Sequence, residues 1–443
     1  MDLRLRFRAI ALALATWTCA GLALAPAQGS ARASRAHLSQ TAPLGGINVT
    51  SLGAGSTLAE ADQAIAVAKE LHASIVRTQI PWDTYEPQGP GQINARAQAF
   101  TDRLVADASA AGIRVVMTVD GTPCWASSAP AAVLRKCSHT RQSPANAWPP
   151  SEPARYGAFV AYLATRYGTR LAGIEIWNEP DQSNEAYWAG PHKPQRYAEL
   201  LRAAYPAIKA ANPQVPVLGG SLVGSNGAFL RALYAAGIKG YYDALAVHYY
   251  DLTLGSLRSI HETQLANGDD TPLWLDEFGW PSCWPRRKLE QEQACVTPQV
   301  QAANIRNVVR SIAGIPWVAA YAIYKTQDSP AEAFGVLSLH GARKPAFAAL
   351  ASVLSSPFGA ASPVTLSLRS RGGRVVASGS GPVGDFMQLE AFRGSTLRYR
   401  ALFTLNRFNR YSLSLPAVLG TQGLRVRVFQ YWSGLAKAAA SSI

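Results

Sequence analysis

The chain has 443 residues, of which 48% are hydrophobic and 16% are charged, and it carries a formal net charge of +14. This length and composition exclude a chain too small to bury its own core, and they predict one large domain with a second, smaller one.

The first 27 residues have the pattern of a secretory signal peptide. Arg4, Arg6 and Arg8 precede the apolar run AIALALATWTCAGLALA, and small residues follow at 25–27. We therefore expect cleavage near residue 27, with a site near residue 33 as second choice, and a secreted or cell-envelope protein. A membrane anchor is the alternative, but an apolar run of about 17 residues is at the short edge of what spans a bilayer. After cleavage we expect no stable membrane anchor, and residues 28–42 would form a linker.

Residues 43–355 repeat a unit of short apolar strand, polar loop and alanine-rich helix. We expect strands at 46–49, 75–79, 114–119, 173–177, 215–219, 244–248, 273–276 and 318–324. We expect helices at 58–72, 95–111, 154–167, 194–211, 227–236, 299–312 and 345–354. Strands that alternate with helices pair in parallel, and eight such units predict a (β/α)8 TIM barrel. A doubly wound open sheet is the competing fold, but no glycine-rich dinucleotide turn follows the first strand.

After residue 357 the pattern changes to two-residue alternation. Segments such as VTLSLRS, LRYRALFTL and RVRVFQYW are separated by glycine and asparagine turns. This pattern predicts a small antiparallel β-sandwich at residues 358–436. We expect residues 437–443 to be a frayed tail.

The same C-terminal part is strongly basic. From residue 358 onward there are ten arginines and one lysine against one aspartate and one glutamate, an excess of nine positive charges. Such a surface is typical of nucleic-acid binding, but in an exported protein it favours an anionic polysaccharide or the cell envelope, and we expect no nucleic-acid partner. A solvated basic surface without a partner is the alternative.

Four cysteines remain after the signal peptide. An even count in an exported chain predicts two disulfides, and nearness in sequence favours Cys124–Cys137 and Cys283–Cys295 over the other two pairings. A zinc site that uses Cys137 and His139 matches no strong ligand spacing, so we expect no metal.

Polar and aromatic side chains collect at the expected strand ends. The C-terminal ends of barrel strands are where the active groups of this fold lie. The residues at or just beyond these ends include Arg77, Trp82, Trp125, Asn178, Glu179, His248, Tyr250, Asp276, Glu277, Trp280 and Tyr324.

Two carboxylates in this group, Glu179 and Glu277, follow strands four and seven. A pair about 5–5.5 Å apart suits retaining glycoside hydrolysis, in which one carboxylate attacks the anomeric carbon and the other acts as acid and then as base. Arg77 and the hydroxyl of Tyr250 or Tyr249 could donate hydrogen bonds to the nucleophile. Asn178 could hold the 2-hydroxyl of the sugar, a contact that strengthens in the transition state.

Each of these residues also has a structural explanation. Arg77 could simply neutralise Glu175, and His248 alone would be an ordinary structural histidine. Asp276 is a rival nucleophile beside Glu277, but alternation along a strand sends adjacent side chains to opposite faces. We therefore expect Asp276 to orient a neighbour. The structural explanations are weakened because all candidates fall at one end of one barrel.

The run EIWNEPD, followed later by DEFGW, resembles clan A glycoside hydrolases. The resemblance implies that Glu179 is the acid/base next to Asn178, and that Glu277 is the nucleophile. His248 and Tyr250 match the His-x-Tyr of that clan on strand six, and the clan's strand-two arginine matches the arginine at position 77. The segments WDTYEPQGPG, TPCWAS and FGVLSLHGARKPAF also fit. The pattern is most similar to glycoside hydrolase family 39, whose members join the barrel to a β-sandwich, and the likeness covers residues 43–350.

The chain departs from the family pattern at two positions. Asp276 stands where threonine or serine commonly precedes the strand-seven glutamate. Strand eight lacks the tryptophan that many members place under the sugar, so Tyr324 or a loop tryptophan would take its place. These departures concern family and substrate rather than the clan.

The expected activity is retaining hydrolysis of β-glycosidic bonds in a polysaccharide, with no metal or organic cofactor. Trp82, Trp125, Trp280 and Tyr324 are expected to stack on sugar rings, and a groove with several aromatic residues favours endo-acting cleavage. A closed pocket would favour an exo-acting β-xylosidase type. A catalytically inactive carbohydrate-binding envelope protein is the alternative from a different class. We expect a monomer.

Overall fold

The computed structural model describes residues 42–49, 57–138, 143–250, 253–285, 295–358, 363–382, 387–430 and 439–443. The expected signal peptide and nearly all of the expected linker lie outside the described residues. Among the helices of the described residues, none combines the length and the apolar character that crossing a bilayer requires.

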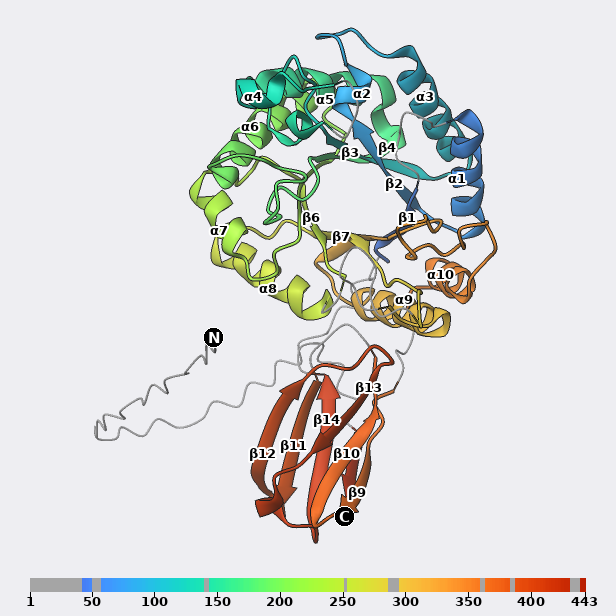
Figure 1. Ribbon diagram of the computed structural model, residues 1–443, viewed down its shortest axis with the longest axis vertical. Helices are drawn as coiled ribbons and strands as arrows, with labels where there is room; N and C mark the ends of the chain where they lie inside the picture. Colours follow the sequence, from blue (N-terminus) through green and yellow to red (C-terminus); the bar gives the residue numbers. More distant parts are fainter. Residues whose placement is uncertain are drawn as a thin grey trace, which may run out of the picture. The chain divides into compact units, whose positions relative to one another are not determined.

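Eight parallel strands close into a barrel, as predicted (Figure 1). They are β1 (Leu44–Asn48), β2 (Ile75–Pro81), β3 (Arg114–Asp120), β4 (Leu171–Ile176), β5 (Val217–Leu222), β6 (Ala244–His248), β7 (Leu273–Phe278) and β8 (Val318–Ile323). Each strand pairs with the next, and β8 pairs with β1 in a register that sets Leu44 opposite Ala320. The closed barrel therefore has no free edge, and the strand ends meet on one rim.

Helices surround the barrel, and seven of them lie where the apolar spacing predicts them. They are α1 (Leu58–Glu70), α3 (Ala95–Ala110), α5 (Pro153–Tyr167), α6 (Lys193–Ala211), α7 (Ala228–Ala235), α9 (Pro298–Ile312) and α10 (Pro345–Ser355). Their starts follow local chemistry: Thr57 and Glu60 form a capping box before α1. Prolines at the first turn begin α9 and α10.

Three further helices were not expected: α2 (Trp82–Tyr85), α4 (Ala131–Leu134) and α8 (Thr253–Ala266). The buried positions of α8 include Leu257 and Ile260 but also Thr263 and Gln264. Because half of its buried face is polar, its apolar periodicity is too weak to predict the helix.

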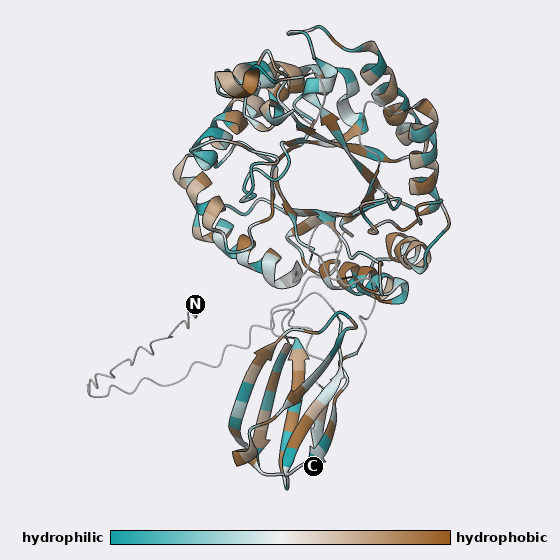
Figure 2. Cartoon of the chain, viewed as in Figure 1, coloured by the Kyte–Doolittle hydropathy of each residue, from teal (hydrophilic) through white to brown (hydrophobic). Residues whose placement is uncertain are grey.

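The barrel strands are nearly all hydrophobic, whereas the helices alternate between hydrophobic and hydrophilic residues (Figure 2). The small residues of β1 allow close packing: a Cβ on Gly46 would lie 2.0 Å from the carbonyl oxygen of Ile75 in β2. Glycine at this position is therefore a steric requirement of barrel closure.

The C-terminal part forms two antiparallel sheets, as predicted. Their strand orders are β13-β10-β9 and β12-β11-β14-β15. The strands are β9 (Ser367–Arg371), β10 (Arg374–Ser380), β11 (Met387–Arg393), β12 (Thr396–Phe403), β13 (Arg410–Ser414), β14 (Leu424–Gln430) and β15 (Ala439–Ser442). They enclose one apolar cluster that includes Val375, Leu389 and Val428.

The expectation of a frayed tail at 437–443 is wrong for its last residues. Strand β15 pairs with β14 and sets Ala439 opposite Val428. Small alanines and serines give little alternation in sequence, but the unpaired edge of β14 offers them a full ladder of backbone hydrogen bonds.

We expect Gly46→Ala to lower the free energy of unfolding by at least about 2 kcal/mol, because the new methyl group meets a backbone carbonyl that cannot rotate away. Chemical denaturation followed by circular dichroism measures this change. Gly314→Ala is the matched control, since its Cβ would have no atom within 4 Å. Equal stability of the two variants would contradict this account of β1.

Candidate active site

Arg77 of β2 is the centre of a buried polar cluster at the rim of the barrel. Its Nε and Nη2 donate to the two oxygens of Glu175 at 2.8 and 3.1 Å. Nη1 donates to Asn48 Oδ1 and to Glu277 Oε2, both at 2.9 Å, and Nη2 donates to Asn178 Oδ1 at 3.0 Å. The guanidinium therefore ties together the ends of four strands.

The surroundings keep Arg77 charged although it is only 3% exposed. Burial lowers the pKa of Arg77, but the carboxylates of Glu175, Asp276 and Glu277 outweigh burial and raise the pKa well above the usual arginine value. The expected ion pair with Glu175 is confirmed, and it coexists with the predicted contact to Glu277.

Both oxygens of Glu277 accept a hydrogen bond. Oε2 accepts from Arg77, and Oε1 accepts from the hydroxyl of Tyr250, which follows β6. Burial and the charge of Glu277 raise the pKa of Tyr250 well above its usual range, so the phenol stays protonated and can donate. Two donors stabilise a carboxylate in its charged form, as a nucleophile requires.

Glu179 lies just beyond β4 in an unusual backbone conformation. Its φ is 47°, and that of Trp177 two residues earlier is 73°, both in the left-handed region. Such conformations cost on the order of 1–3 kcal/mol for a non-glycine residue and persist where the surrounding structure holds them. Oε1 of Glu179 lies 2.9 Å from Nδ1 of His248, and Oε2 accepts from the Gln182 amide. The turn aims this carboxyl at the strand-six histidine.

The two predicted catalytic carboxylates are close together. One oxygen from each of Glu179 and Glu277 and one ring nitrogen of His248 lie within 4.8 Å of one another. This separation is of the order expected for retaining glycosidases, about 5–5.5 Å, and shorter than the roughly 6.5–9.5 Å of inverting ones.

His248 lies between the two carboxylates and is fully buried. Nδ1 is 2.9 Å from Glu179 Oε1 and 3.7 Å from Glu277 Oε2. Burial lowers the pKa of His248, but the charge of Glu277 and the hydrogen bond to Glu179 outweigh burial and raise the pKa to about 9. Nδ1 therefore carries a proton and donates a hydrogen bond to Glu179. Nε2 lies 3.2 Å from Arg77 Nη2, from which it can accept a hydrogen bond when the ring is neutral, and 3.5 Å from Asp276 Oδ1.

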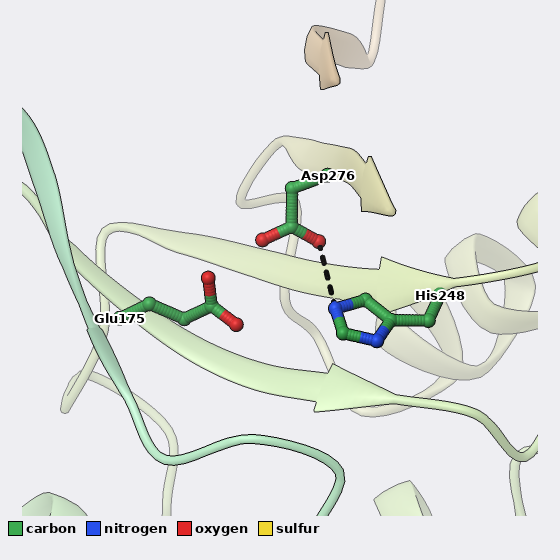
Figure 3. A group of neighbouring side chains, drawn as sticks. All are labelled: Glu175, His248 and Asp276. Atoms are coloured by element: carbon green, nitrogen blue, oxygen red, sulfur yellow. Dashed lines mark ion pairs between the residues drawn. The ribbon is translucent and has the colours of Figure 1, made fainter. Parts of the chain in front are cut away.

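Asp276 also belongs to the cluster, and its carboxyl group points toward Glu175 and His248 (Figure 3). The expectation that strand alternation turns Asp276 away from the side of Glu277 is wrong. The register of β7 against β8 shifts between Leu275 and Phe278. Both Asp276 and Glu277 consequently reach Arg77, at 3.4 and 2.9 Å.

Two triads of this cluster have the donor types of a metal site: Glu175, His248 and Asp276, and Glu179, His248 and Glu277. The guanidinium of Arg77 already lies against carboxylates of both triads. A divalent cation would therefore have to share the space with a fixed positive charge, and the residues do not fit a metal.

The predicted tryptophan platforms are corrected in part. Trp82 is fully buried, and its Nε1 donates to Glu86 Oε2 at 2.7 Å. Trp280 is 5% exposed. Neither offers an open ring face to a sugar, so the prediction of stacking is wrong for both. Trp125 is half-buried, and its Nε1 donates to the backbone oxygen of Glu86 at 2.7 Å.

Tyr324, just after β8, lies beside Tyr250, the residue whose hydroxyl donates to Glu277. Its ring is edge-on to Tyr250 with 6.1 Å between centroids, and its hydroxyl donates to Glu332 Oε2 at 2.9 Å. The ring is half-buried, so it can still present a face toward the rim.

Three site residues were missed in the sequence. Asn48, at the end of β1, accepts from Arg77 and donates from Nδ2 to the backbone oxygen of Asp276 at 2.9 Å. Gln182 holds the outer oxygen of the carboxyl at 179. Asp181 accepts from the backbone amides of residues 223 and 224, which ties the β4 loop to the loop after β5. The polar end of the apolar strand LGGIN was a usable signal for Asn48, whereas loop-to-loop contacts have no local signature.

The cysteines pair as predicted, Cys124 with Cys137 and Cys283 with Cys295. Each bridge closes a loop that leaves the C-terminal end of a barrel strand, β3 and β7. Two of the rim loops are thereby restrained.

We predict a pH-dependent contribution of His248 to stability. Because its pKa is raised from 6.5 to about 9 in the folded protein, this stabilisation is fully present below pH 6.5 and is lost as the pH rises through 9. The stability difference between the wild type and His248→Gln should therefore shrink by on the order of 2–3 kcal/mol between pH 6 and pH 9.5.

Denaturant unfolding at several pH values measures this difference. His261→Gln is the control of opposite sign, since burial lowers the pKa of His261 and its contribution should grow as the pH rises. If the stability difference between the wild type and His248→Gln stays constant with pH, the raised pKa of His248 is refuted.

Comparison with known proteins agrees with this geometry. Residues 168–339 match the family described as glycosyl hydrolase catalytic core. No curated protein matches the sequence.

Solved structures share the fold at low sequence identity. A GH39 enzyme from Xanthomonas axonopodis pv. citri is 15% identical with a TM-score of 0.51, over 87% of this chain and 97% of that one. A monomeric β-xylosidase from Caulobacter crescentus CB15 is 16% identical with a TM-score of 0.50, over 85% and 95%. A GH30 endoxylanase from Clostridium papyrosolvens C71 is 14% identical with a TM-score of 0.50, over 89% and 98%. The predicted resemblance is thus confirmed: residues 168–339 match the family of the glycosyl hydrolase catalytic core, and the barrel has the fold of family 39 and family 30 enzymes.

Proposed function

We propose that the protein hydrolyses β-glycosidic bonds with retention of configuration, through a covalent glycosyl-enzyme intermediate. The observation that carries the proposal is the asymmetry of two close carboxylates. Glu277 accepts one hydrogen bond on each oxygen, from Arg77 and Tyr250, whereas Glu179 lies against a single histidine and a loop amide.

In the first step Glu277 attacks the anomeric carbon. A bond forms between its carboxylate oxygen and that carbon while the bond to the leaving oxygen breaks, and Glu179 gives its proton to the leaving oxygen. Asn178 supports this step, because its Oδ1 is occupied by Arg77 and its amide nitrogen is thereby turned away from Arg77 toward a sugar hydroxyl. Tyr250 and Arg77 donate hydrogen bonds to Glu277 and thereby stabilise its negative charge before the attack and after the ester breaks.

In the second step water attacks the same carbon from the side that the leaving group vacated. Glu179, now a carboxylate, takes the proton of that water, and the ester bond to Glu277 breaks. His248 can donate to Glu179 in both steps, so the acid/base keeps its position as its charge changes. Two inversions at one carbon give net retention.

Substitution of the two carboxylates should separate their roles. Glu277→Gln should abolish turnover of every aryl β-glycoside, because the attacking oxygen is lost. Glu179→Gln should lose about 10²–10⁴ in kcat/KM with a poor leaving group but far less with an activated nitrophenolate, which needs no protonation. Initial rates on the two aryl glycosides, with product stereochemistry by NMR, measure this. Equal activity of all three proteins, or an inverted first product, would refute the mechanism.

We further propose a polysaccharide as the substrate, cleaved within the chain. The exo-acting β-xylosidase type is the alternative, and the length of the first products decides between them. With Trp82 and Trp280 buried, the support for an endo-acting groove rests on Trp125 and Tyr324. The inactive carbohydrate-binding alternative is disfavoured, because a binding protein has no need of two carboxylates with this separation and these donors.

An anionic polymer suits the C-terminal domain. On the outer face of the β12-β11-β14 sheet, Arg400 Nε and Arg427 Nε donate to Glu390 at 3.1 and 2.7 Å. The Arg425 guanidinium lies over the ring of Phe392 at 5.1 Å. These contacts order the arginines while leaving Arg400 and Arg427 58% and 50% exposed. Ordered guanidinium groups suit bidentate binding of carboxylates, so we propose a uronate-bearing polysaccharide.

We expect the double variant Arg400→Gln/Arg425→Gln to weaken binding of a polyuronate roughly two- to fivefold per arginine, while turnover of an aryl glycoside is unchanged. Affinity electrophoresis at two salt concentrations measures binding. Arg369→Gln/Arg374→Gln, on the exposed β9 and β10, is the matched control with the same charge loss. Equal weakening of polyuronate binding in both double variants would show a general effect of charge. It would overturn the proposal that the β12-β11-β14 face binds the polymer.

We also propose that the protein is exported and acts as a monomer. The two disulfides are compatible with an oxidising compartment outside the cytosol.

A further inference from the structure

Asp276 has a buried carboxyl group to which no neighbouring group of the described residues donates a hydrogen bond. It has no exposed surface, and neither of its oxygens has a hydrogen-bond partner among the described residues. The nearest cations are Arg77 Nε at 3.4 Å and His248 Nε2 at 3.5 Å, and Arg77 Nε is already donated to Glu175 at 2.8 Å. Figure 3 shows the three acid and imidazole groups of this layer.

An ionised Asp276 would be costly at this position. Three carboxylates, those of Glu175, Asp276 and Glu277, would then face the charges of Arg77 and His248. A buried carboxylate that accepts no hydrogen bond loses its hydration without replacement. A neutral carboxyl group has a proton to donate, and an oxygen of Glu175 lies within 4.8 Å of one of its own, in the same group as His248.

We propose that Asp276 is protonated, donates a hydrogen bond to Glu175, and acts as a positioning residue for Arg77 and His248. The inference rests on the proposed function, because these two groups hold Glu277 and Glu179. The shared proton makes Glu175 and Asp276 together a single negative counter-ion. Arg77 then keeps an N–H group for Glu277, because a neutral Asp276 does not compete with Glu175 and Glu277 for its hydrogen bonds.

The electrostatics of the two acids agree with this assignment. Burial raises the pKa of Asp276 well above its usual range, and the charge of Glu175 adds to the rise. Burial also raises the pKa of Glu175, but the charge and hydrogen bonds of Arg77 outweigh it and lower the pKa. The difference follows from the contacts, since Arg77 bonds Glu175 through two nitrogens and approaches Asp276 only at 3.4 Å.

A consequence is that activity should fall when Asp276 loses its proton at higher pH. The groups that face Asp276 are Glu175 from β4, Arg77 from β2, His248 from β6 and Glu277 beside it on β7, while Asn48 of β1 donates to its backbone oxygen. If Asp276 lost its proton, it would compete for Arg77 and His248 and withdraw them from the two catalytic carboxylates.

Two nearly isosteric variants test the positioning role. Asp276→Asn keeps a neutral donor toward Glu175 and should retain kcat/KM within about threefold at pH 6–7, with the alkaline limb moved to higher pH. Asp276→Leu fills the same space but cannot donate, and should lose at least about tenfold in kcat. Thermal unfolding of both variants checks that they fold. Similar losses in the two folded variants, or an unmoved alkaline limb in Asp276→Asn, would overturn the proposal.

An infrared measurement tests the proton itself without turnover. The wild type at pH 7 should show the carbonyl stretch of a protonated carboxylic acid that is missing in Asp276→Asn. Absence of this difference means that Asp276 is ionised and sinks the inference. If the band is present while the wild type cleaves no glycoside, the proposed function fails and the shared proton stands, so the two failures are distinguishable.

Discussion

The site depends on one buried cation. Arg77 can lie inside the barrel rim only because Glu175 pairs with it through two hydrogen bonds, and because Asn48 and Glu277 take its remaining donor. A buried charge that loses its partner costs several kcal/mol, so the ends of β1, β4 and β7, which supply these neighbours, are coupled. Closing the barrel brings these strand ends together around Arg77. The same contacts that keep the guanidinium paired therefore also set the geometry of the site.

This constraint explains how two glutamates of the same type acquire different roles. Glu277 is placed directly on Arg77 and Tyr250, so its negative charge is supported whenever the barrel is closed. Glu179 instead extends from a left-handed turn beyond β4 and meets His248. One carboxylate belongs to the rigid cluster, and the other lies on a turn at the edge of that cluster.

The barrel and the main site residues were predictable because they follow from periodicity. Strand and helix patterns fix which residues end a parallel strand, and those ends must meet on one rim; Arg77, Glu179 and Glu277 were found this way. The orientation of Asp276 was not predictable, because it depends on a register shift between β7 and β8. Trp82 was misassigned because it begins a helical turn immediately after β2, and only the packing of that turn decides that the ring points inward.

Three tryptophans of the rim hold loops by hydrogen bonds; Trp82 and Trp177 are buried, and Trp125 is half-buried. Nε1 of both Trp82 and Trp125 donates to Glu86, and Nε1 of Trp177 donates to the backbone oxygen of Tyr187 in the loop after β4. Each indole thus fixes a loop by one hydrogen bond while its ring fills space beneath it. Because these hydrogen bonds form without any sugar present, the protein itself fixes the loops that carry them.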